Sequence, residues 1–311
     1  MADIPTFTLN NGVAMPGVLF GCFQGPECRE TADIEGLHDA LAAGYRGLDT
    51  ANNYNTEAAV GEGVRKTDIP REQLFITTKL PSTMHHDVKA SFEDSLKQLG
   101  TYIDLYLMHW PQGKKEDGTV YDGPPDGPTF NDVWEEMEKL LETKQVRAIG
   151  VSNFSHKTLG QLLQTAKVTP AVCQVEGHPF HPDFAFMKFC HSKGIHMSYY
   201  SPLGNGQTVL KDADLVEIGD AHGVSAGQVC LAWALANGVS VNPRSTNAER
   251  IKGNITLPKL TDAEVKRIND IHKNDEKRHS RLCLQPYNKE DNTASGWSLE
   301  KLGWDVGFKH A

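Results

Sequence analysis

The chain has 311 residues, of which 39% are hydrophobic and 23% charged, so it can bury a large core as one barrel or as two ordinary domains. Its formal net charge is −9 and no basic cluster recurs along it, which argues against a nucleic-acid-binding surface. No apolar run reaches the roughly 18 residues that a membrane span needs, and the N-terminus lacks the pattern of a signal peptide. These features predict a cytoplasmic globular protein.

The six cysteines are scattered and form no Cys-x-x-Cys pair. Such spacing favours reduced thiols in a large intracellular chain over a disulfide framework or a zinc site. We therefore expect no bound metal and no disulfide among Cys22, Cys28, Cys173, Cys190, Cys230 and Cys283.

The first predicted element is a β-hairpin. Residues Phe7 to Met15 contain two short runs joined around Asn11-Gly12, a strong short-range hairpin signal, and we expect this hairpin to cover one end of the fold. Strand candidates follow at Val18–Cys22, Arg46–Thr50, Leu74–Leu80, Ile103–Met108, Val146–Val151, Ala171–Val175, His196–Tyr200 and Ser240–Asn242. Helix candidates alternate with them at Thr31–Ala43, Thr56–Lys66, Asp87–Leu99, Phe130–Thr143, His156–Thr165, Asp183–Ser192 and Ala213–Ala236 (broken near Gly223), and Asp262–His272 follows a short segment at Asn247–Gly253.

Strands that alternate with helices in this way predict an α/β fold, a (β/α)₈ TIM barrel, in one domain over residues 1–311. Its core would span about 7–273 and its C-terminal tail 274–311. A doubly wound sheet is the alternative, but Gly17 to Gly25 does not supply the Gly-x-Gly-x-x-Gly turn of that fold. A long loop, Pro111 to Thr129, and the tail have the length of functional lids or of disordered segments, and the loop would lie on the catalytic face.

Four polar residues lie at or just past the ends of three successive strand candidates: Asp49, Tyr54, Lys79 and His109. Taken singly, Asp49 suits a helix cap, Lys79 a solvated strand end and His109 a hydrogen-bonded core histidine. The joint placement of these polar residues at strand ends favours a proton-transfer site instead. A free tyrosine is a poor acid at pH 7, and a nearby lysine cation lowers its pKa. Asp49 would keep that lysine charged, and His109 would add a hydrogen bond to the oxygen that receives the proton.

Several segments in order resemble the aldo-keto reductase superfamily from about Phe7 to Asn254. They are Gly47-Leu-Asp-Thr-Ala51 with Tyr54, Thr77-Thr-Lys-Leu80, Leu107-Met-His-Trp-Pro111, Gly150-Val-Ser-Asn-Phe154, Gln174-Val-Glu176 with His178-Pro179, and Tyr200-Ser-Pro-Leu-Gly204. The resemblance implies a barrel that binds NADPH and reduces a small-molecule carbonyl compound without a metal. It implies that Tyr54 is the general acid, that Lys79 and Asp49 lower its pKa, and that His109 orients the carbonyl. The similar subgroup that reduces steroid carbon–carbon double bonds typically has glutamate in place of His109, so the histidine favours an aldehyde or ketone.

The resemblance also implies a cofactor site. Ser152, Asn153 and Gln174 would hold the nicotinamide carboxamide and Tyr200 would stack on its ring, although Ser152 and Asn153 also suit a helix cap. Ser201 and Leu203 belong to the same cofactor set, and the 2′-phosphate contacts would come from Arg244, Ser245, Thr246, Arg250 and Asn254. Arginine binds phosphate bidentately, so we expect NADPH rather than NADH; a solvated surface residue is the alternative for Arg250.

Phe23 and Trp110 would line the substrate pocket. Pro81-Ser82 stands where relatives often have an aromatic residue, which predicts a more open pocket, and Leu282 and Leu284 of the tail could close it. An NADPH-binding, redox-sensing regulatory subunit with little turnover is the alternative function, since such a protein could retain every motif. We expect a monomer or weak homo-oligomer, because no long heptad seam occurs.

Overall fold

The computed structural model describes residues 3–25, 34–206, 208–274, 281, 287–288 and 290–304. Its main sheet has eight strands in sequential order, all paired in parallel. A parallel bridge between Val18 and Val241 joins the first strand to the last and closes the barrel. The strands are β3 (Leu19–Gly21), β4 (Gly47–Asp49), β5 (Phe75–Leu80), β6 (Ile103–Met108), β7 (Val146–Ser152), β8 (Val172–Glu176), β9 (His196–Tyr200) and β10 (Ser240–Asn242).

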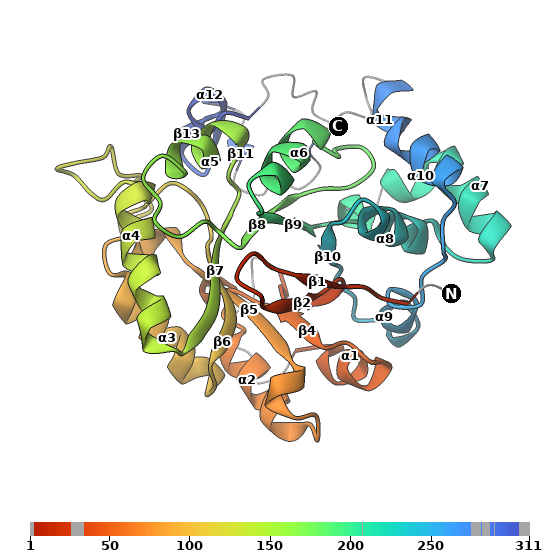
Figure 1. The fold of residues 1–311 in the computed structure, drawn as a ribbon, viewed down its shortest axis with the longest axis horizontal. Helices are drawn as coiled ribbons and strands as arrows, with labels where there is room; N and C mark the ends of the chain where they lie inside the picture. The colour runs from red at the N-terminus through yellow and green to blue at the C-terminus, as the bar shows by residue number, and fades with distance from the viewer. Residues whose placement is uncertain are drawn as a thin grey trace.

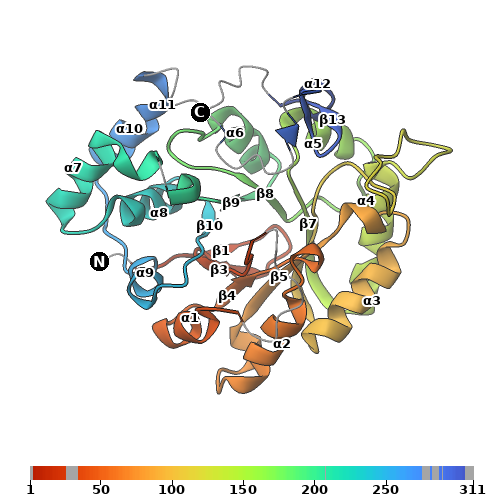
Figure 2. The same cartoon turned by 180° about the vertical axis from the view of Figure 1, so that it is seen from behind.

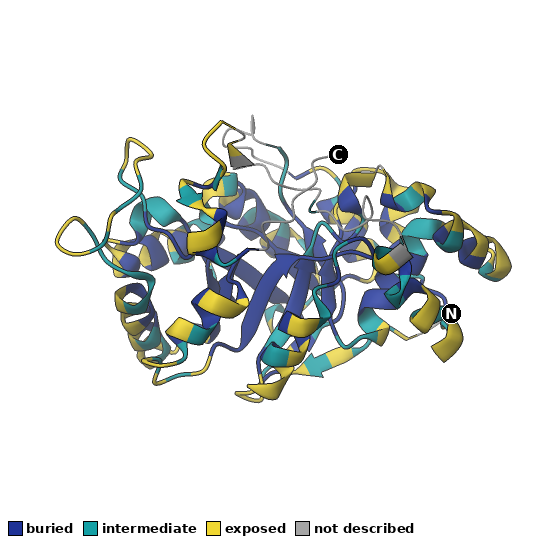
Figure 3. Cartoon of the chain, turned by 90° about the horizontal axis from the view of Figure 1, so that it is seen from above, coloured by how far each residue is buried: buried dark blue, intermediate teal, exposed yellow. Residues whose placement is uncertain are grey.

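Helices follow the strands and surround the barrel (Figures 1 and 2). Because the helices enclose the strands, buried strands fill the centre of the barrel while the outer surfaces of the helices are exposed (Figure 3). The (β/α)₈ prediction is confirmed. The α-helices are α1 (Leu37–Ala43), α2 (Glu57–Lys66), α3 (Val88–Leu99), α4 (Phe130–Leu140), α5 (His156–Leu162), α6 (Phe184–Ser192), α7 (Ala213–His222), α8 (Ala226–Ala236), α9 (Ala248–Gly253), α10 (Asp262–Asn269), α11 (Ile271–Asn274) and α12 (Leu299–Leu302). Short 3₁₀ turns are η1 (Asn52–Tyr54), η2 (Arg71–Gln73), η3 (Ser82–Met84), η4 (Leu141–Thr143), η5 (Gly204–Gly206) and η6 (Val209–Lys211).

The structure differs from the predicted helices mainly at their ends. Helix α1 begins at Leu37 rather than Thr31, because Gly36 adopts a left-handed conformation (φ 82°) at its N-cap; residues 31–33 lie outside the described part. The expected break near Gly223 is present, with that glycine ending α7 at φ 65°. The last predicted helix divides into α10 and α11, and the segment after β10 contains α9, which starts at the Asn247 cap.

Alternating strand residues serve two cores. Phe20, Ile76 and Tyr106 belong to the large cluster that includes the surrounding helices. Leu19, Phe75 and Leu105, at or near the amino ends of their strands, join a smaller cluster; Leu9 and Met15 contribute to it from the N-terminal segment. That segment is the predicted hairpin, with β1 (Thr6–Thr8) antiparallel to β2 (Ala14–Pro16). It therefore covers the amino end of the barrel and leaves the carboxyl end for the polar residues.

The described part of the tail lies against the loop after β6. Strands β11 (Tyr287–Asn288), β12 (Thr293–Ala294) and β13 (Trp297–Ser298) form a small antiparallel sheet followed by α12. Gln112 of the loop donates from Nε2 to the carbonyl oxygens of Ala294 and Ser295 at 3.0 and 3.3 Å. Leu282 and Leu284 lie outside the described residues. Within the described part of the chain, no helix is both long and apolar enough to cross a membrane.

Candidate active site

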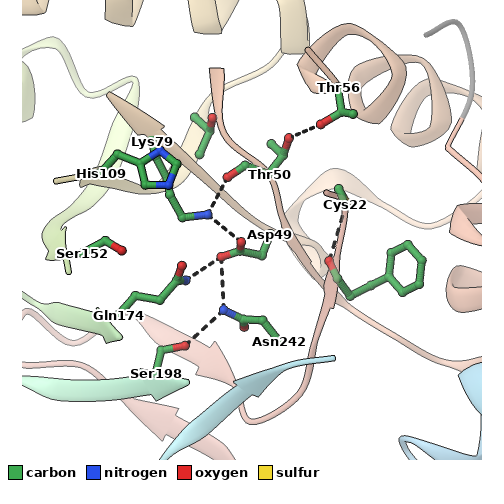
Figure 4. A network of polar contacts seen from close by, with 12 residues as sticks. Cys22, Asp49, Thr50, Thr56, Lys79, His109, Ser152, Gln174, Ser198 and Asn242 are labelled. Atoms are coloured by element: carbon green, nitrogen blue, oxygen red, sulfur yellow. Dashed lines mark hydrogen bonds and ion pairs between the residues drawn. The ribbon is translucent and has the colours of Figure 1, made fainter. Parts of the chain in front are cut away.

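A buried ion pair lies at the carboxyl end of the barrel. Lys79 of β5 is fully buried, and its Nζ lies 2.6 Å from Asp49 Oδ1 and 2.9 Å from the carbonyl oxygen of Thr50. The second carboxylate oxygen of Asp49 accepts from Gln174 Nε2 at 2.6 Å and from Asn242 Nδ2 at 3.3 Å (Figure 4). Burial alone would lower the pKa of Lys79, but Asp49 and Tyr54 raise it above its usual value. Lys79 is therefore held as a cation.

Tyr54 lies in η1, directly after β4, with its ring beside this cation. Lys79 Nζ lies 5.0 Å from the ring centroid, and the rings of His109 and Phe23 lie 5.6 and 4.9 Å away. The expected lowering of the Tyr54 pKa is not the net result in this structure. Burial raises the pKa of Tyr54 above its usual value, although the charge and the hydrogen bond of Lys79 act in the opposite direction. Lys79 thus offsets part of the increase that burial causes in the Tyr54 pKa, but the net shift is still upward.

His109 follows β6 and is buried beside the ion pair. Burial, followed by the charges of Lys79 and His85, holds the pKa of His109 well below its usual value, so the ring is neutral at pH 7. Its Nδ1 has no hydrogen-bond partner among the residues that the structure describes. A neutral imidazole has one donor nitrogen, which suits an uncharged oxygen as partner.

The carboxamide candidates form one hydrogen-bonded group next to His109. Asn153 Nδ2 donates to the His109 carbonyl oxygen at 2.9 Å and to Ser152 Oγ at 3.3 Å, and Tyr200 donates its hydroxyl to Asn153 Oδ1 at 2.8 Å. Ser152, Asn153 and Gln174 are all buried. The backbone carbonyl oxygen of Gln174 accepts from the Asn153 backbone nitrogen at 2.9 Å and its side-chain amide donates to Asp49, so Gln174 joins this group to the ion pair. Ser201, with φ 48°, and Leu203 follow at the end of β9.

The phosphate candidates gather after β10. Arg250 in α9 donates from Nε to Ser245 Oγ at 3.3 Å, and Arg244 donates from Nη2 to Gln24 Oε1 at 3.1 Å. Both arginines are exposed, as is Thr246, whereas Ser245 and Asn254 are buried. The accessible guanidinium of Arg250 beside the Ser245 hydroxyl, with a second exposed arginine at the adjacent position 244, offers the kind of donors that a phosphate monoester prefers. The residues present therefore fit a 2′-phosphate.

The candidate pocket residues are only partly buried. Phe23 lies against Tyr54, and Trp110 packs against a cluster made by the described tail, with its ring 5.7 Å from Trp304. Trp304 had no signal in the sequence, because tail contacts follow from tertiary structure alone. Asn242 was also missed as an Asp49 partner, although it is a polar residue at a strand end, the pattern that identified Lys79.

The chain is similar to known proteins along most of its length. Residues 23–273 match the family model described as Aldo/keto reductase family. Glycerol 2-dehydrogenase (NADP(+)) of Saccharomyces cerevisiae is 39% identical over 284 residues, covering 86% of this chain and 90% of the relative. The 9,11-endoperoxide prostaglandin H2 reductase of Trypanosoma cruzi is 39% identical over 278 residues, covering 87% and 92%.

A solved structure agrees with the fold. The crystal structure of a Bombyx mori aldo-keto reductase in complex with NADP has a TM-score of 0.78 and 32% identity to this chain, and covers 87% of this chain and 93% of that one. The shared barrel and the matching family model lead to one conclusion: the chain belongs to the aldo/keto reductase family.

Proposed function

We propose that the chain reduces an aldehyde or ketone to an alcohol with NADPH, and that Tyr54 donates the proton. Its family places it among the oxidoreductases. The observation that carries the proposal is the buried Asp49–Lys79 ion pair beside Tyr54 and the neutral ring of His109. A cation, a phenol and a neutral imidazole around one point can bind and protonate a carbonyl oxygen.

Each residue has a separate task in this proposal. Tyr54 gives its proton to the carbonyl oxygen, and the positive charge of Lys79 stabilises the phenolate that remains. Asp49 keeps Lys79 charged and fixed, while His109 donates a hydrogen bond that holds the carbonyl in place. When bound, NADPH supplies the hydride that reduces the carbonyl carbon.

The cofactor assignment has two supports. The yeast relative carries NADP(+) in its name, and the Bombyx mori structure contains NADP. In this chain, Ser152, Asn153 and Gln174 offer amide and hydroxyl groups for a carboxamide, and Tyr200 lies beside them. Arg244 and Arg250, with Ser245, Thr246 and Asn254, would bind the 2′-phosphate that NADPH has and NADH lacks.

The regulatory-subunit alternative is not supported, because the relatives reported above are named as a dehydrogenase and reductases. Two equally similar relatives have names with different substrates, so identity alone does not select a substrate. We propose a single-domain cytoplasmic enzyme that acts on small molecules as a monomer or weak homo-oligomer. The net charge of −9 and the four buried free cysteines of the described part are consistent with that setting.

A panel of aliphatic and aromatic aldehydes, aldoses, sugar acids and ketones, followed by NADPH absorbance, tests this proposal. The wild-type chain should oxidise NADPH with at least one carbonyl class and form the corresponding alcohol. Binding of NADPH without oxidation in the presence of every carbonyl class would reject the enzyme and favour the regulatory subunit.

A further inference from the structure

Glu57, the first residue of α2, is a buried carboxylate outside the four catalytic candidates. Its relative exposure is 0%, and carboxylates are almost never fully buried unless they are paired. One oxygen, Oε1, accepts from Thr78 Oγ1 at 2.6 Å, and the other, Oε2, accepts from Asn52 Nδ2 at 3.0 Å. The carboxylate therefore joins two separate segments of the chain.

These two segments carry the proposed proton donor and its lysine. Asn52 is the first residue of η1, the short turn that ends at Tyr54. Thr78 directly precedes Lys79 in β5, so the two side chains leave opposite faces of one strand. Glu57 thus lies behind the barrel wall and connects the turn of Tyr54 with the strand of Lys79.

A second connection closes the same turn at its base. The hydroxyls of Thr50 and Thr56 lie 2.7 Å apart and both residues are fully buried (Figure 4). Thr56 is the N-cap residue of α2, yet its side chain makes no capping hydrogen bond and is directed to Thr50 instead. The carbonyl oxygen of Thr50 also accepts from Lys79 Nζ. Thr56 therefore attaches the turn of Tyr54 to Thr50, the residue whose carbonyl oxygen accepts from Lys79.

We propose that Glu57 is a positioning residue, which fixes the Tyr54 turn against the Lys79 strand in the geometry that proton donation requires. This inference rests on the proposed function. Misplacement of a reacting group by about 1 Å can lower a rate by about 100-fold, so a two-armed contact at this place has kinetic consequences. Burial raises the pKa of Glu57, while the hydroxyls of Thr78 and Ser95 and the amide of Asn52 favour its charged form. If Glu57 served only as a carboxylate at the start of α2, its replacement would change the stability of the fold and leave kcat unchanged.

The test compares Glu57→Ala with Glu57→Gln and with a control on the same helix, Glu62→Ala, whose side chain is exposed and pairs with Arg65. Glu57→Ala should lower kcat for carbonyl reduction by roughly 10- to 100-fold, with KM and the NADPH Kd changed less than about threefold. Glu57→Gln should recover most of kcat, because its amide oxygen can still accept from Asn52 and its amide nitrogen can meet the Thr78 hydroxyl. Glu62→Ala should keep the wild-type kcat.

Thr78→Val gives a second test if Glu57→Ala does not fold. It removes one arm of the contact and leaves the carboxylate, and it should lower kcat by roughly 3- to 10-fold at an unchanged NADPH Kd. Folded Glu57→Ala or Thr78→Val protein with kcat within about twofold of wild type would overturn the positioning role, whatever the change in Tm. A wild-type chain that oxidises no NADPH would instead reject the proposed function, so the two failures are distinguishable.

Discussion

Two buried aspartates lie at opposite ends of the barrel and have different surroundings. Asp104, in β6 near its amino end, accepts from Arg71 Nη2 at 2.7 Å, Arg147 Nη1 at 2.9 Å and the Ile76 backbone nitrogen at 2.9 Å. Asp49, at the carboxyl end of β4, binds one lysine and two side-chain amides. Both carboxylates are almost fully buried.

The partners explain why we assign only Asp49, and not Asp104, to the proposed reactive site. Arginine stays protonated under all ordinary conditions, so the Asp104 group is a fixed structural connection. Lys79, the cationic partner of Asp49, lies beside two groups with shifted pKa values. The pKa of Tyr54 is raised and the pKa of His109 is lowered. Burial of a carboxylate therefore does not by itself indicate a catalytic site. The groups with shifted pKa values next to Asp49, at the carboxyl end of the barrel, are the reason for proposing one there.

The largest expected effect comes from the proton donor. Tyr54→Phe keeps the ring between Phe23 and His109 but removes the hydroxyl, so kcat should fall by at least about 100-fold. The NADPH Kd should stay nearly the same, because the hydroxyl is not part of the proposed cofactor contacts. Steady-state NADPH oxidation and a fluorescence titration of NADPH measure both values. Equal turnover by the variant and the wild type would remove Tyr54 from the mechanism.

Asp49→Asn should have the next largest effect on turnover. It keeps the size of the side chain but removes the negative charge that raises the pKa of Lys79. We expect kcat to fall by roughly 10- to 100-fold, because an uncharged lysine stabilises the Tyr54 phenolate less well. An Asp49→Asn variant with wild-type kcat across pH 6 to 9 would contradict the role of the ion pair.

Asp104→Asn is the matched change at the other end of the barrel. It weakens two ion pairs and should destabilise the fold by about 3 kcal/mol, while kcat per folded molecule should stay within about twofold of wild type. Urea unfolding and steady-state assays measure the two quantities on one preparation. A large loss of kcat at unchanged stability would show that the two ends do not differ as described.

Arg250→Ala should have a smaller and more selective effect. It removes a guanidinium from the proposed 2′-phosphate site, so the NADPH Kd should rise by about 10-fold while the NADH Kd stays unchanged. Lys252→Ala, an exposed residue of the same helix α9, is the control and should leave both values unchanged. Equal losses for both cofactors after Arg250→Ala would move the phosphate site elsewhere.

The barrel could be predicted from the sequence because its signals are local. Apolar runs such as Ile103–Met108 alternate with amphipathic helices, and the observed strand bounds agree within about two residues. The start of α1 was wrong because the left-handed conformation of Gly36 depends on the surrounding fold. Helix ends are set by such single residues, which hydrophobic periodicity does not detect.

The catalytic candidates were also accessible from the sequence, since Asp49, Lys79 and His109 are costly residues at the ends of buried strands. The direction in which the Tyr54 pKa shifts could not be predicted from the sequence, because it depends on how far burial outweighs the charge of Lys79. Contacts between distant segments were missed for a related reason. The Trp110–Trp304 pair and the Asn242–Asp49 hydrogen bond join residues far apart in the chain, and no sequence pattern sets such distances.

A crystal structure of the chain with NADP+ and a carbonyl inhibitor tests the central claim most directly. The account predicts that the nicotinamide carboxamide lies against Ser152, Asn153 and Gln174, and that the inhibitor oxygen lies within hydrogen-bond distance of both Tyr54 and His109. A cofactor bound elsewhere, or an inhibitor oxygen that contacts neither side chain, would contradict it.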